Sequence, residues 1–155
     1  MDRETTCCFV GQRGLPKDKI EDIVKNLNQK IDNLIDQGVT NFISGGSLGL
    51  DQIAASLIVA KKEMGKNIRL IFALPYKNQD EHWKTEQKNL YHDLLAQADE
   101  VVHVSPQYGD GCIKKRNRYM VSRAAYCICA MAYPTEETEK TIKFARQKGL
   151  KITSL

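Results

Sequence analysis

The chain has 155 residues, of which 42% are hydrophobic and 27% are charged. This balance excludes an intrinsically disordered chain, and the apolar runs are too short to cross a bilayer, so we predict no membrane partner. A formal net charge of +4 permits an anionic ligand but does not require nucleic acid. Because Met1–Thr5 leads directly into a strand pattern without a signal peptide, we predict a cytoplasmic protein.

Short apolar runs alternate with helical patterns along the chain. Strands are predicted at residues 6–10, 39–43, 68–74, 101–104, 126–131 and 150–153. Helices are predicted at 20–35, from 50 to a stop at Gly65, and at 90–98, 113–124 and 136–148. Continuously apolar strands that alternate with helices are typical of a parallel sheet covered on both faces. We therefore predict an α/β fold, with residues 1–155 forming a single three-layer Rossmann-like domain around a mostly parallel sheet.

The segment 44–51 joins a predicted strand directly to a helix through small residues. The first turn of such a helix offers unpaired N–H groups and the positive end of its dipole, which together bind anions. We expect glycines here to let a phosphate approach and Ser47 to cap the helix or contact the ligand. Asp51 can bind a ribose hydroxyl or simply interact, as an N-terminal carboxylate, with the helix dipole. A turn that only packs the helix against the sheet is the alternative. The candidate ligand-binding residues are Ser44, Gly45, Gly46, Ser47, Gly49 and Asp51.

All strand-to-helix loops of a parallel sheet lie at one edge, because the crossovers are right-handed. Ligands bind outside the carboxyl ends of such strands, near the point where the strand order reverses. The loops predicted for this edge hold glycines, arginines and aromatic residues, whereas the opposite loops hold little more than helix stops. The further candidate ligand-binding residues are Gly11, Gln12, Arg13, Pro75, Tyr76, Tyr108, Arg116 and Asn117.

These candidates have different expected roles. Arg13 follows a strand and a glycine, where a guanidinium can hold a phosphate with two hydrogen bonds or brace its own loop. Arg116 and Arg118 are two positions apart on a predicted helix, so they cannot share a face, and we expect Arg116 to reach the ligand. Tyr76 and Tyr108 can stack on a base or pack beneath their own loops.

The five cysteines and three histidines form no metal-binding pattern or catalytic triad, and Cys112, after Gly109–Gly111, is a weak nucleophile candidate. Two cysteine pairs, at 7–8 and at 127 and 129, lie in strand-like runs without zinc-site spacing, so we predict buried thiols. No metal site is predicted. The sequence leaves open whether the protein is an enzyme.

Five segments together resemble a known family: Cys8–Arg13, Ser44–Ala55, Leu74–Tyr76 with Trp83, Tyr108–Cys112 and Arg116–Val121. The chain is similar to the YpsA-like branch of the SLOG superfamily, Rossmann-like domains related to the DNA-processing protein DprA and to the LOG phosphoribohydrolases. The resemblance implies that a nucleotide or nucleotide-derived ligand binds or is sensed at the predicted edge, and that the protein is a homodimer. The identity of this ligand, and of any cofactor, stays unknown.

Two other functions are compatible with the resemblance. One is hydrolysis of a nucleotide or an N-glycosidic bond, with Asp51, Asp110 or Glu136 as acid or base. The other is a DprA-like module for single-stranded nucleic acid, which the sequence permits but does not favour. The family's first loop commonly has histidine where this chain has Gln12, and segment 133–138 replaces a Gly-Gly-Thr before the last helix. The LOG signature is also absent, which counts against phosphoribohydrolase chemistry.

Overall fold

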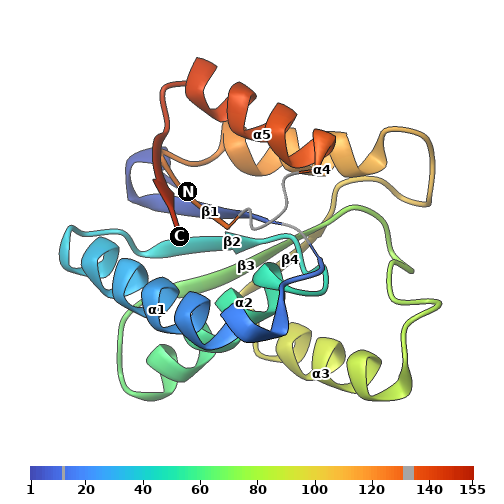
Figure 1. Ribbon diagram of the computed structural model, residues 1–155, viewed down its shortest axis with the longest axis horizontal. Coiled ribbons are helices and arrows are strands. Elements are labelled where there is room, and N and C mark those ends of the chain that lie inside the picture. The colour runs from blue at the N-terminus through green and yellow to red at the C-terminus, as the bar shows by residue number, and fades with distance from the viewer. Residues whose placement is uncertain (12, 131–134) are drawn as a thin grey trace.

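The computed structural model describes residues 1–11, 13–130 and 135–155 and places a parallel sheet between two helical layers (Figure 1). Neighbouring strands are parallel throughout, in the order β4-β3-β2-β1-β5-β6. The strand order therefore reverses between β1 and β5. The strands are β1 (Thr6–Gly11), β2 (Asn41–Ser44), β3 (Arg69–Leu74), β4 (Glu100–His103), β5 (Tyr126–Ala130) and β6 (Lys151–Ser154).

The α-helices cover both faces of the sheet, below and above it in Figure 1. The lower layer consists of α1 (Ile20–Asp36), α2 (Leu50–Glu63) and α3 (Thr85–Ala96), and the upper layer of α4 (Cys112–Ser122) and α5 (Glu136–Gln147). Short 3-10 helices, η1 (Arg3–Thr5) and η2 (Lys17–Lys19), precede β1 and α1. This arrangement confirms the predicted α/β class. The largest boundary error is at α3, which begins at Thr85 rather than near residue 90.

The central strands are apolar at nearly every position because helices cover both faces of the sheet. Along β1, Cys7 and Phe9 pack into the core between the sheet and helices α1 and α2. Cys8 and Val10 pack into the core between the sheet and helices α4 and α5. This is the two-residue alternation of a strand. All five cysteines are free and buried, as predicted for Cys7, Cys8, Cys127 and Cys129.

The carboxyl ends of the parallel strands meet at one edge, and the helices that follow them start there. At the reversal of the strand order, the end of β1 lies against the start of α2: a Cβ placed on Gly11 would lie 2.6 Å from the Leu50 Cδ2 atom. No helix within the described ranges is long and apolar enough to pass through a membrane.

Candidate functional site

A cavity of about 550 Å³ lies at the carboxyl end of β1, where the strand order reverses. Its walls are the end of β1, the starts of α2 and α5, and one face of α4. Open α/β sheets bind their ligands at this position. The predicted site residues that line the cavity are Gly11, Arg13, Ser47, Asp51, Arg116 and Asn117.

Arg116 connects α4 to the turn before α2. It is 4% exposed, and its guanidinium nitrogens donate to acceptors on both elements. Nη1 donates to the carbonyl oxygen of Gly45 over 2.7 Å, and Nη2 donates to Ser47 Oγ over 3.4 Å. On its own helix, Nε donates to Asn117 Oδ1 over 2.9 Å. These bonds fix the guanidinium in one position. Arg116 therefore joins α4 to the glycine turn that precedes α2.

Asp51 faces this buried guanidinium from the first turn of α2. It is 7% exposed, and its Oδ2 atom accepts a hydrogen bond of 3.2 Å from the N–H of Ser47. Burial raises the pKa of the Asp51 carboxyl, although the positive charge of Arg116 and the bond from Ser47 oppose that rise. Burial also lowers the pKa of Arg116 against the attraction of Asp51. Two buried side chains of opposite charge, Asp51 and Arg116, therefore line the cavity.

The glycines of the turn make room for protein atoms. A Cβ on Gly45 would lie 2.4 Å from Arg116 Nη1 and 2.8 Å from Asp51 Oδ2. Gly46 has a positive φ of 72°, and its Cβ would lie 2.8 Å from Leu74 Cδ2. The space expected to admit a phosphate at these two glycines is thus filled by the protein itself.

The turn also uses several of its own polar groups. The N–H of Gly46 donates to Ser44 Oγ over 3.2 Å, and this hydroxyl donates to the carbonyl oxygen of Asp51 over 2.9 Å. Ser47 does not cap the helix: the N-cap of α2 is Gly49, with a φ of 90° and no side-chain cap. Ser44, Gly45, Gly46 and Gly49 do not line the cavity; Ser44 and Gly45 bond to Asp51 and Arg116, which do.

Pro75, Tyr76 and Tyr108 lie elsewhere along the same edge. They follow β3 and β4, two and three strands away from β1, and none of them lines the cavity. The rings of Tyr76 and Tyr108 meet edge to face, with their centroids 5.3 Å apart, and Tyr108 is 71% exposed. The structure therefore separates these aromatic residues from the other candidates. Gln12, Tyr133 and Pro134 lie outside the described residues.

Part of the cavity wall was missed from the sequence. Ile113 and Met120 line it from α4 together with Arg116 and Asn117. These four positions recur at i, i+3, i+4 and i+7, the spacing of one helix face, which could have identified them.

The start of α5 supplies the opposite wall. Thr135 caps this helix by accepting the N–H of Thr138 over 3.2 Å, and both residues line the cavity. Glu136 and Glu137 also line it, so this wall contributes two acidic side chains to the cavity. Among the described residues, no group of three or more histidine, cysteine or acidic side chains is placed to hold a metal ion.

The geometry agrees with comparisons to known proteins. The YpsA family model, described as the YspA SLOG family, matches residues 13–153. The uncharacterized SPbeta prophage-derived protein YoqJ of Bacillus subtilis is 27% identical over 146 residues, 86% of this chain and 82% of YoqJ. The UPF0398 protein BH1768 of Halalkalibacterium halodurans is 31% identical over 104 residues, 66% of this chain and 55% of that protein. The chain therefore spans little more than half of this second relative.

Among solved structures, DNA processing protein A from Helicobacter pylori matches with a TM-score of 0.68 at 17% identity. The match covers 98% of this chain and 65% of the other, and that structure is described as showing a single-stranded DNA binding mode. At this level of identity, the match supports the Rossmann-like fold alone.

Proposed function

We propose that the cavity between β1, α2, α4 and α5 binds a nucleotide or a nucleotide-derived ligand. The chain belongs to the YpsA family of SLOG proteins, whose model matches residues 13–153. The observation that carries this proposal is the position of the cavity at the reversal of the strand order, with arginine and carboxylate side chains in its walls. A cavity of about 550 Å³ is within the usual range for small-molecule sites.

The phosphate contact is assigned to Arg13. It is exposed, it lines the cavity, and it lies close enough to influence the pKa of Asp51. Arg116, by contrast, already donates to acceptors on the protein. We therefore assign it the role of positioning the turn and not of binding the phosphate.

Polar groups for the sugar and the base surround this point. Asp51 lines the cavity with an oxygen acceptor suited to a ribose hydroxyl, and Asn117 lies on the neighbouring wall. The carboxylates of Glu136 and Glu137 accept hydrogen bonds but repel phosphates, so they favour the ribose or base end of the ligand at the start of α5. We therefore place the phosphate at Arg13 and the nucleoside between Asp51 and α5.

Calorimetric titration with adenine and guanine nucleotides tests the proposal. Arg13→Ala removes a charge-assisted contact worth about 1.5–3 kcal/mol, so affinity should fall roughly 10- to 150-fold. Arg69→Ala is the matched control, because Arg69 is a half-exposed arginine at the opposite end of β3. Equal affinity in the two variants would contradict the assignment of Arg13.

Native mass spectrometry of the freshly purified protein is the complementary measurement, since a tightly held nucleotide should copurify. Incubation with the nucleotides that bind, followed by product analysis, separates binding from the hydrolase alternative. We expect no turnover. Release of a free base or phosphate would make the carboxylates at the cavity candidates for acid–base chemistry. The homodimer, the cytoplasmic location and the single domain over residues 1–155 stay predictions.

A further inference from the structure

Positive charge is concentrated in the last third of the chain. Residues 112–155 contain ten lysines and arginines and three acidic residues, whereas residues 1–111 contain thirteen basic and sixteen acidic residues. The first of these segments contains α4, α5 and β6. The layer of α4 and α5 therefore lies in the basic part of the chain, and the layer of α1, α2 and α3 lies in the part with a net negative charge.

A groove of about 420 Å³ runs between α4 and α5 within this basic layer. Lys114 and Arg118 line it from α4, one helical turn apart, and Lys140 and Lys143 line it from α5. All four of these residues are exposed. Two rows of cations thus face each other across a concave surface.

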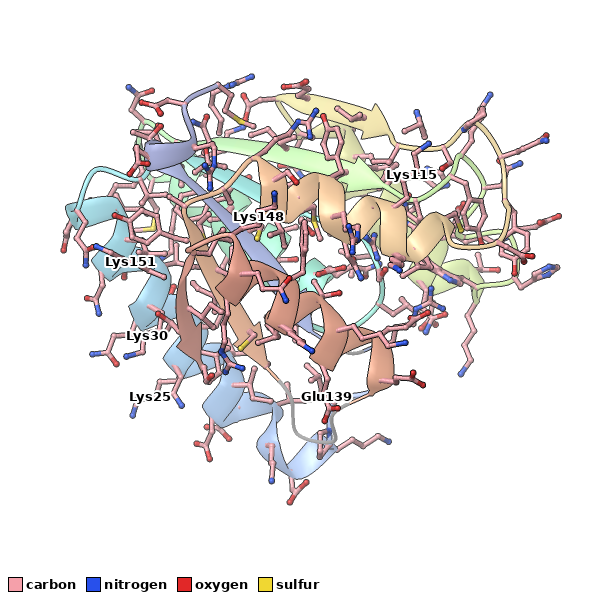
Figure 2. The ribbon with its side chains drawn as sticks, turned by 90° about the horizontal axis from the view of Figure 1, so that it is seen from above. Lys25, Lys30, Lys115, Glu139, Lys148 and Lys151 are labelled. Carbon is pink, nitrogen blue, oxygen red and sulfur yellow. The ribbon has the colours of Figure 1, made fainter. Side chains whose placement is uncertain are left out.

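Contacts at the base of the groove fix its shape. Asn117 Nδ2 donates to Thr141 Oγ1 over 3.2 Å and joins the two helices. The Arg118 guanidinium lies 4.4 Å from the centre of the Phe144 ring, which holds this cation in place. Figure 2 looks onto α4 and α5 lying side by side, with Lys115 and Lys148 on the same layer.

Acidic groups are few in the groove. Glu137 lines it, and Lys140 Nζ forms an exposed ion pair of 2.7 Å with Glu136 at the start of α5. Glu139 lies on the side of α5 that faces away from α4 (Figure 2). The lysine and arginine side chains therefore outnumber carboxylates four to one among the groove residues.

We propose that the groove between α4 and α5 binds the phosphate backbone of single-stranded nucleic acid. Lysine is depleted from protein–protein interfaces, whereas nucleic-acid interfaces are strongly positive. A membrane surface requires exposed apolar side chains, and none of the exposed large hydrophobic residues in the described ranges belongs to α4 or α5. Reading a duplex in its major groove requires a projecting helix, whereas these two helices lie flat on the sheet.

This strand-binding surface is distinct from the nucleotide cavity, although Asn117 and Glu137 border both. Its affinity should depend on salt, because each neutralised phosphate releases counterions. With about four phosphate contacts, log affinity should fall against log salt with a slope of about −3, or about 50-fold between 50 and 200 mM.

Fluorescence anisotropy with a labelled 20-nucleotide single strand of mixed sequence tests the proposal. The groove variant is Lys114→Glu with Lys143→Glu, and the matched control is Lys25→Glu with Lys30→Glu on α1 (Figure 2). Both variants change the formal net charge from +4 to 0. The groove variant should lose at least tenfold in affinity and about half of the salt slope, whereas the control should stay within about threefold of the parent.

Three results would overturn the proposal. They are no binding by the parent protein at 50 mM salt, equal losses in the two variants, or tighter binding to a duplex or to phosphatidylserine vesicles than to the single strand. Thermal melts should show that both variants are folded. Calorimetry of the groove variant with a mononucleotide should give the parent affinity, so that failure of this surface is distinguishable from failure of the cavity.

Discussion

At the carboxyl edge of the sheet, the half formed by β1 and β5 contains a cavity lined by the buried Asp51 and Arg116, whereas the half formed by β3 and β4 carries the half-buried Tyr76 and the exposed Tyr108. Both halves are built from strand-to-helix loops that contain polar residues. They differ because α2 on one face of the sheet and α4 and α5 on the other together wall the cavity at the end of β1, where the strand order reverses. A ligand site in such a fold thus depends on enclosure by two layers, and not on the composition of a loop.

Removal of the buried guanidinium should have the largest effect on the cavity half. Arg116→Ala leaves Asp51 as an uncompensated buried carboxylate, so it should lower the free energy of unfolding by about 3–5 kcal/mol. Arg118→Ala, two residues away, removes an exposed cation from the face of Phe144 and should cost about 0.5–1 kcal/mol. Urea unfolding of both variants measures the contrast, and similar losses would show that Arg116 has no special structural role.

A methyl group tests how tightly each half is packed. Gly45→Ala places a Cβ against the Arg116 guanidinium and the Asp51 carboxylate, so it should destabilise the protein by about 1–3 kcal/mol. Gly109→Ala, in the loop after β4, meets no heavy atom within 4 Å and should change stability by less than about 1 kcal/mol. Thermal melts of the two variants and the parent measure this difference in stability. Equal shifts would mean that the turn at Gly45 can relax.

The ionisation of Asp51 provides a test that depends on pH. Because burial raises the pKa of Asp51 in the folded protein, the contribution of this group to stability is greatest below its unfolded pKa and is lost as pH rises through the folded pKa. Asp51→Asn removes that dependence. The free energy of unfolding of the variant minus that of the parent should therefore increase as pH rises from about 4. A decrease over the same range would mean that attraction by Arg116 outweighs burial.

The smallest effect is expected for the aromatic half. Tyr108→Ala should change the affinity for the best-bound nucleotide by less than about twofold, because Tyr108 lies outside the cavity. Asn117→Ala removes a polar group from the cavity wall and should cost about 1 kcal/mol, or about fivefold. Calorimetry of both variants compares the two halves directly. A larger loss for Tyr108→Ala would move the ligand toward β3 and β4.

The local pattern of the sequence determined the order of elements, the parallel sheet and the edge that carries the candidate site. Strand and helix periodicity depend on neighbours within about seven residues, so the buried runs around Phe9 and Ile43 could be recognised without a structure. The burial of Cys7, Cys8, Cys127 and Cys129 followed from the same pattern.

Only the tertiary structure decided which loop residues meet and which glycines are obligatory. Arg116 reaches Gly45 across 71 positions of sequence, and the contact forms because α4 and α2 start on opposite faces of the same strand end. The separation of Tyr108 from the cavity and the pairing of α4 with α5 into a basic groove are likewise set by strand order and helix packing. Such contacts join distant segments, and no periodicity along the chain encodes them.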